Sequence, residues 1–393
     1  MALDPASPKS NWNFPTAVRF GAGRIAELPE ACRALGMARP LIVTDPGLAR
    51  LPMLGEAVAS LSKAGLGAAV FSDVQGNPVG KNVDDGLKAY RAGKHDGVVA
   101  FGGGSALDAG KAIALMTGQK RPIFDFEDRE DWWTRVDPAG IAPIVGVPTT
   151  SGTGSEVGRS SVITDESVHL KKIIFHPKMQ PAIVIADPAL TLGLPANITA
   201  WTGMDALSHN LEAYCTAGYH PMAQGIALEG MRLVKDWLPA AVKNGADLAA
   251  RCHMMSASAM GATAFQKGLG AMHALSHPCS AVLNTHHGLT NAVVMPYVLV
   301  FNRTAIEAKM AGLARYLGLA DPSTRAVVDW VLELRRQIGI PHTLAEIGVR
   351  EEHVERFAPM AANDLCAGGN PIPVGVPEMA ALYRNALRGV LPN

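Results

Sequence analysis

The sequence has no excess of charge of either sign, because 35 basic and 35 acidic side chains give a formal net charge of zero. No run of Lys or Arg forms a stripe that could bind a polyanion, so nucleic acid is not the expected partner. No apolar stretch approaches the ~18–20 residues that a membrane span requires. These absences leave small molecules as the expected ligands.

Cys-x-x-Cys motifs and a signal-peptide pattern are also missing from the sequence. The cysteines are odd in number and form no Cys-x-x-Cys pair, which is typical of reduced thiols in a cytoplasmic enzyme. The first fourteen residues lack a basic-then-apolar signal pattern and are expected to form a short flexible tail. The sequence therefore predicts a cytoplasmic protein whose thiols are Cys32, Cys215, Cys252, Cys279 and Cys366.

Strand-like and helix-like segments alternate in the first half of the chain. With 393 residues, 48% of them apolar, the sequence is long enough for two hydrophobic cores. The expected strands are 40–45, 68–74 and 96–105, and the expected helices between them are 51–65 and 80–93. This alternation predicts an α/β domain with a mostly parallel sheet and helices on both faces.

After residues 186–195 strand-like runs almost vanish and helical periodicity continues to the C-terminus. Gly and Pro separate the segments. The expected helices are 198–216, 221–238, 246–264, 270–281, 288–301, 303–317, 323–338, 351–362 and 376–389. We therefore predict an α/β domain over residues 1–194 and an all-helical domain over residues 195–393.

Histidines concentrate in the helical half. Asp205 and His209 are four residues apart, so on a helix they project from one face. Four of the twelve histidines fall between residues 273 and 287, among Gly, Ala, Leu and Met, where an unpaired ring is costly to bury. A lone Asp-x-x-x-His is more often a surface pair or a helix cap. Together with further imidazoles it forms a mixed oxygen and nitrogen set, which suits Fe(II) or Zn(II) better than Ca(II) or Mg(II).

A glycine-rich turn follows the strand-like segment VVAF. Gly102, Gly103, Gly104 and Ser105 precede a helical pattern, and such a turn lets backbone N–H groups approach a phosphate. A tight turn without a ligand is the alternative, since the spacing is not G-x-G-x-x-G. Asp45 ends another strand, where a carboxylate can accept hydrogen bonds from a ribose or simply begin a turn.

Three motifs resemble the iron-containing (group III) alcohol dehydrogenases: GMDALSHNLEAY at 203–214, HALSHP at 273–278 and NTHHG at 284–288. The resemblance runs almost end to end. Neither His277 nor His286 falls on a ligand position of that family. The implied ion is Fe(II), with Zn(II), Mn(II), Ni(II) or Co(II) as alternatives. The implied metal ligands are Asp205, His209, His273 and His287.

The resemblance also implies a nicotinamide dinucleotide. The segment from Gly102 to Lys111 matches the family's GGGS-x-x-D-x-x-K motif, which holds the pyrophosphate. Asp45 matches the ribose position, which favours NAD over NADP. The implied cofactor-binding residues are Asp45, Asn77, Gly102, Gly103, Gly104, Ser105, Asp108, Thr149, Thr150, Thr153, Lys171 and Leu190.

The expected reaction is hydride transfer between an alcohol and NAD⁺ at a site between the domains, with the ion as Lewis acid. His277 is the candidate proton relay, and orienting a metal ligand is its alternative role. Phe265, Lys267 and Cys366 are candidate substrate contacts. Lys267 would pair with an acidic tail, as in 4-hydroxybutyrate or succinate semialdehyde, unless it is merely a solvated lysine. Cys366 is otherwise a buried structural thiol.

Other functions fit the same architecture. A lyase of the dehydroquinate synthase type needs clustered basic residues, and the helical half has few. A maleylacetate-type reductase works without metal, whereas all four ligand positions here carry competent ligands. An NAD-binding protein without catalysis is the third alternative. A homodimer is expected because two-fold dimers are the commonest assembly.

Overall fold

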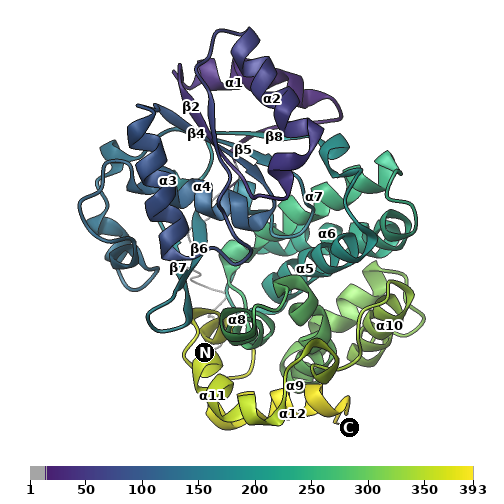
Figure 1. The fold of residues 1–393 in the computed structure, drawn as a ribbon. Coiled ribbons are helices and arrows are strands. Elements are labelled where there is room, and N and C mark those ends of the chain that lie inside the picture. Colours follow the sequence, from purple (N-terminus) through teal and green to yellow (C-terminus); the bar gives the residue numbers. More distant parts are fainter. Residues whose placement is uncertain (1–13, 15, 393) are drawn as a thin grey trace. The chain divides into compact units, whose positions relative to one another are not determined.

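The computed structural model describes Phe14 and residues 16–392 (Figure 1). Apart from Phe14, the tail predicted at the N-terminus lies outside these residues. Backbone contacts divide the described chain into two units. Phe14–Thr150 and Gly154–Gly193 form the first unit, while Ser151–Thr153 and the chain from Leu194 onward form the second.

The first unit contains a six-stranded sheet in the order β1-β8-β5-β4-β2-β3. Every neighbouring pair is parallel, with Val43 of β2 opposite Ala100 of β4, for example. Strands β2, β4, β5 and β8 are buried along their whole length, as the continuous apolar runs indicate. The strands are β1 (Ala17–Phe20), β2 (Pro40–Val43), β3 (Ala69–Phe71), β4 (Gly97–Gly102), β5 (Ile144–Pro148) and β8 (Ile183–Ala186). The predicted fold class is confirmed.

Helices cover both faces of this sheet (Figure 1). On one face α1 (Leu28–Ala34) and α2 (Pro52–Lys63) pack in a core with Ile42 and Val99. On the other face α3 (Gly80–Ala92) and α4 (Gly104–Met116) pack with Leu41 and Val98. Neighbouring residues of a strand point to opposite faces, so each strand contributes to both cores.

A two-stranded antiparallel sheet also belongs to the first unit. It consists of β6 (Ser160–Asp165) and β7 (Leu170–Phe175). In β6, Ser161 and the last three residues, Ile163 to Asp165, are buried, while Ser160 and Val162 are partly exposed. The β-branched residues Val162, Ile163 and Thr164 favour a strand in this segment.

The second unit has no strand between Leu194 and Pro392. Its helices are α5 (Ala196–Cys215), α6 (Pro221–Lys243), α7 (Leu248–Ala264), α8 (Ala271–Leu283), α9 (His287–Tyr316), α10 (Thr324–Gln337), α11 (Glu351–Ala362) and α12 (Val376–Arg388). The two helices predicted at 288–301 and 303–317 are one helix, α9. Asn302, at the expected break, is buried and exchanges two hydrogen bonds with the Asn370 side chain, at 2.9 and 2.8 Å. Among the described residues, no helix has the length and apolarity needed to cross a membrane.

Candidate functional site

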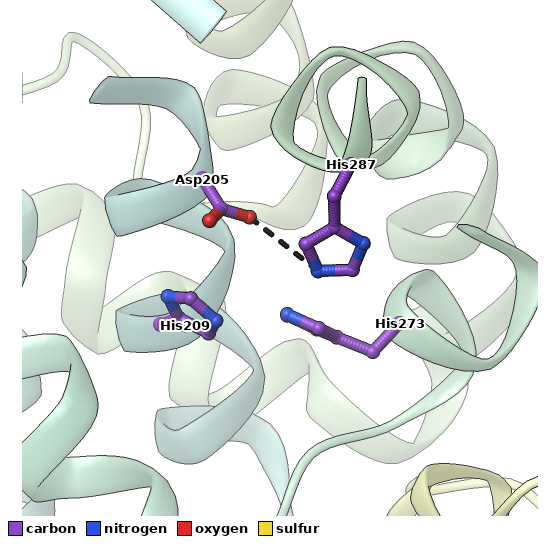
Figure 2. A group of neighbouring side chains, drawn as sticks. All are labelled: Asp205, His209, His273 and His287. Carbon is purple, nitrogen blue, oxygen red and sulfur yellow. Dashed lines mark ion pairs between the residues drawn. The ribbon is translucent and has the colours of Figure 1, made fainter. Parts of the chain in front are cut away.

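One carboxylate and three imidazoles converge in the helical unit (Figure 2). Asp205 and His209 project from the same face of α5, while His273 lies on α8 and His287 begins α9. One ligand atom from each lies within 4.8 Å of the others. Asp205 Oδ1 and His287 Nε2, for example, are 3.8 Å apart. Four donors so close together can share one divalent ion.

A close helix–helix approach at Gly288 supports this convergence. A Cβ on Gly288 would lie 2.4 Å from the Trp201 carbonyl oxygen and 2.8 Å from the Asp205 Cβ. Only a residue without a side chain therefore fits at this contact between α9 and α5. His286 serves a different purpose from His287, because its Nδ1 accepts a hydrogen bond from the Leu289 N–H at 3.4 Å and caps α9.

The buried histidines of the cluster differ in protonation. Asp205, His209 and His273 are buried. Burial lowers the pKa of His209 to about 4, so this imidazole is neutral at pH 7, as a metal ligand must be. For His273, burial also acts to lower the pKa, but the adjacent Glu212 carboxylate outweighs it and the pKa is raised. Burying a carboxylate next to imidazole nitrogens costs free energy unless a bound cation interacts with them.

Each imidazole is held through its Nδ1 atom. His273 Nδ1 donates to Glu212 Oε2 at 2.6 Å, and His209 Nδ1 lies 3.3 Å from the Gly152 carbonyl oxygen. His287 Nδ1 lies 3.0 Å from Ser276 Oγ. Outer partners of this kind orient metal-binding histidines and leave Nε2 available for an ion.

A second cluster lies beside the first. His277, one turn after His273, stacks on the His287 ring with centroids 5.3 Å apart. Its Nδ1 is 2.7 Å from Asp364 Oδ2, while Asp364 Oδ1 accepts from the Cys366 N–H at 2.8 Å. Burial would raise the pKa of Asp364, but His277 and the Cys366 hydrogen bonds lower it below its ordinary value. An ionised Asp364 thus holds the proton on His277 Nδ1.

The candidate substrate residues are placed unequally. The Phe265 ring lies 5.2 Å from the His209 ring, and Cys366 is buried beside Asp364. Lys267 points elsewhere, because its Nζ donates to the Ala213 carbonyl at 3.0 Å, to the Thr216 carbonyl and to Thr216 Oγ1 at 2.9 Å. It therefore caps the C-terminus of α5 together with Lys309, which donates to the same turn. The sequence predicted that Lys267 either contacts substrate or is solvated. The structure shows instead that it caps a helix.

Replacing Lys267 with Met is expected to destabilise the protein by about 1–3 kcal/mol, because buried α5 carbonyls lose a donor. Burial, followed by the charge of Lys309, lowers the pKa of Lys267 from 10.5 to about 7. Between these values the folded protein binds fewer protons than the unfolded chain, so wild-type stability gains with rising pH. The stability gap between wild type and Lys267→Met is therefore expected to widen from pH 7 to 10 in urea unfolding.

The control for this substitution is Lys243→Met, which removes an exposed lysine in the last turn of α6. Both variants are expected to keep the wild-type ratio of activities on succinate semialdehyde and butanal. A selective loss of activity on the acidic aldehyde in Lys267→Met, with unchanged stability, would show that the ammonium binds substrate after all.

In the α/β unit the glycine turn lies where β4 ends and α4 begins. Gly102 has φ +149°, and a Cβ there would lie 2.7 Å from the Ala106 Cβ. Gly103 is the N-cap of α4, and a Cβ on it would lie 3.2 Å from Thr150 Cγ2. The Thr149 N–H donates to the Gly102 carbonyl at 3.0 Å. Side chains at Gly102 and Gly103 would therefore crowd the turn that begins this 13-residue helix, whose N-terminal N–H groups are of the kind that bind phosphate.

Asp45 lies at the same edge of the sheet. Its Oδ1 accepts from the N–H groups of Gly47 and Leu48, both at 2.9 Å, and its Oδ2 lies 3.7 Å from the Cβ position built on Gly102. Strands β2 and β4 are adjacent here, and the chain order reverses between them. Such a reversal is where open α/β sheets bind nucleotides.

Asp108 and Lys111 have structural partners. The Asp108 carboxylate accepts from Ser155 Oγ and from the Val162 N–H, and buried Lys111 donates to the Ser155 carbonyl at 2.9 Å. Both side chains therefore fasten the segment before and within β6 to α4. The cofactor role of Asp108 remains a prediction, as do those of Ser105 on α4, Asn77, Thr153, Lys171 on β7 and Leu190.

Sequence reasoning missed Glu212, Asn291 and Asp364. Glu212 follows His209 by three residues and Asn291 follows His287 by four, so helical spacing alone could have placed both beside the cluster. Asp364 is 87 residues from His277, and no local spacing connects them.

A parallel α/β unit with an open glycine turn and a helical unit with an Asp/His₃ cluster are the two parts of a metal-dependent dehydrogenase. The chain belongs to the iron-containing alcohol dehydrogenase family. The model for iron-containing alcohol dehydrogenases matches residues 15–188, and the C-terminal model of the Fe-containing alcohol dehydrogenase family matches residues 199–387. The resemblance seen in the sequence is confirmed, and the protein is an oxidoreductase of the alcohol dehydrogenase type.

Relatives match over almost the whole chain. The NAD-dependent methanol dehydrogenase of Bacillus methanolicus is 35% identical over 385 residues, covering 96% of this chain and 100% of that protein. The 4-hydroxybutyrate dehydrogenase of Cupriavidus necator is 37% identical over 368 residues, covering 91% and 94%. The crystal structure of a 1,3-propanediol oxidoreductase matches with a TM-score of 0.91 at 34% identity, covering 96% and 99%.

Proposed function

We propose that this protein is an NAD-dependent alcohol dehydrogenase that holds one divalent ion, Fe(II) in the first place, between Asp205, His209, His273 and His287. The convergence of their four ligand atoms within 4.8 Å is the observation that carries the proposal. The mixed donor set also accepts Zn(II), Mn(II), Ni(II) or Co(II). Bound there, an ion would supply Lewis-acid polarisation of the substrate oxygen.

The glycine turn and Asp45 would bind different parts of NAD. The N–H groups at the start of α4 would bind the pyrophosphate, because Gly102 and Gly103 leave room for close approach. Asp45 Oδ2 would accept hydrogen bonds from the ribose hydroxyls, and the same charge would repel the 2′-phosphate of NADP. We therefore propose NAD as the cofactor.

His277 would move the proton of the reaction. Asp364 holds its Nδ1–H, which leaves Nε2 as the acceptor for the hydroxyl proton of an alcohol. In the reverse direction the same nitrogen would return the proton to the carbonyl oxygen. Its stacking against His287 keeps the ring beside the metal ligands.

For the substrate we propose a short neutral primary alcohol. Two of the three relatives named above are named for methanol and 1,3-propanediol, which are neutral. The capping role of Lys267 leaves its ammonium engaged with α5. A four-carbon hydroxy acid is the second candidate, favoured by the identity of 37% with the 4-hydroxybutyrate dehydrogenase. A homodimer and a cytoplasmic location remain predictions.

Metal removal tests the proposed function. Protein purified without oxygen and loaded with Fe(II) is expected to hold one ion per chain and to reduce NAD⁺ with a short primary alcohol. Chelation is expected to lower this rate about a thousand-fold or more, since several kcal/mol of charge stabilisation are lost. Reloading is expected to restore it, and NADP⁺ to be the poorer cofactor. Full activity of the stripped enzyme would instead indicate a metal-independent reductase, and turnover without net NADH formation a lyase.

A further inference from the structure

The side chain of Asn291 lies inside the candidate metal cluster. It is fully buried on α9, one turn after His287. Its Nδ2 is 2.9 Å from Asp205 Oδ1, 3.2 Å from His287 Nε2 and 3.3 Å from His273 Nε2. Ser208 Oγ lies 3.4 Å from the same nitrogen. The amide nitrogen thus touches three of the four ligand atoms.

The other end of this amide is unsatisfied. Asn291 Oδ1 is buried and has no hydrogen-bond partner among the described residues. An acceptor buried without a donor is uncommon, because it loses its hydration and gains nothing in return. Beside a cluster of one carboxylate and three imidazoles, an unpaired carbonyl oxygen suggests a cation as the absent partner.

The contacts of Nδ2 fit a cluster without an ion. An NH₂ group donates, and it meets acceptor atoms that would otherwise repel one another. The same NH₂ group would face a bound cation with its positive end. Metal ligands lie at roughly 2.0–2.2 Å from a first-row ion, so an ion bound to these atoms would also lie close to this NH₂ group, which cannot coordinate it.

We propose that Asn291 is a fifth protein group of the metal centre, a claim that rests on the metal site of the proposed function. Without an ion, the two N–H groups of Nδ2 are shared among Asp205 Oδ1, His273 Nε2 and His287 Nε2 and hold these side chains in place. With an ion, a half-turn of the amide brings Oδ1 toward the cation, which gives the buried oxygen its partner and removes the NH₂ group. Amide oxygen is a hard donor, which adds to the preference of the site for Fe(II), Mn(II) or Co(II) over softer ions.

The test is a titration of the metal-free protein with Co(II) against a competing chelator, in wild type, Asn291→Ala and Asn291→Asp. Loss of the amide oxygen is expected to raise the Kd of Asn291→Ala for Co(II) about 10–100-fold. Asn291→Asp keeps an oxygen of the same reach and is expected to bind as tightly as wild type or more tightly. The Co(II) absorption bands, which report the number of ligands, are expected to change in Asn291→Ala.

His253→Ala is the matched control, because this histidine is on α7 and stacks on Trp237 away from the cluster. Circular dichroism and thermal unfolding of the metal-free variants show whether each is folded. An unchanged or tighter Kd in Asn291→Ala, or a Kd in Asn291→Asp as weak as that of Asn291→Ala, overturns the role of Asn291. If wild type itself binds no stoichiometric Co(II), the proposed metal site fails, and the role of Asn291 with it.

Discussion

Replacing His209 with Ala is expected to leave the protein folded but to lower kcat/KM for alcohol oxidation about a thousand-fold or more. His209 is a buried, neutral imidazole whose pKa is lowered to about 4, so its removal takes away a ligand and not a surface charge. The three remaining donors can hold an ion only weakly. Metal analysis after gel filtration is therefore expected to find much less than one ion per chain.

His253→Ala serves again as the comparison, since it removes an imidazole of the same unit that contacts Trp237. It is expected to keep both metal content and turnover. Free imidazole added to His209→Ala is expected to restore part of the metal content, because it supplies the missing nitrogen. A His209→Ala protein with one ion per chain and wild-type turnover would remove His209 from the site.

The sequence was most informative where one helix carries two functional residues. Asp205 and His209 share a face of α5 for the reason that helical spacing predicts. Spacing could not decide between His286 and His287. That choice came from the resemblance, and the structure separates the two because α9 begins at His287, so His286 is its N-cap.

Long-range contacts account for what the sequence did not predict. Lys267 Nζ donates hydrogen bonds to carbonyl oxygens about fifty residues earlier in the chain. Asp364, which is hydrogen-bonded to His277, lies in a later segment. Asn302 does not end a helix because Asn370 satisfies its amide from outside α9. In each case the hydrogen-bond partner of a polar group lies far away in the sequence, so the local sequence pattern could not predict it.

The pair of His277 and Asp364 gives the second large effect. Replacing His277 with Ala is expected to lower kcat for alcohol oxidation about 10²–10⁴-fold near neutral pH, because a positioned base is lost. Asp364→Asn is expected to lower kcat in the same direction, since an amide in place of the Oδ2 acceptor no longer fixes the proton on His277 Nδ1. Both variants are expected to keep one ion per chain.

The pH profile distinguishes proton transfer from support of the metal. If His277 accepts the hydroxyl proton, hydroxide can replace it, so the deficit of His277→Ala is expected to shrink as pH rises from 7 to 10. If His277 only orients the neighbouring His287, whose ring stacks on it at 5.3 Å, the variant would lose metal and its deficit would persist at every pH. Metal content and the pH profile of kcat, measured on the same preparations, therefore decide whether His277 transfers the hydroxyl proton or orients His287.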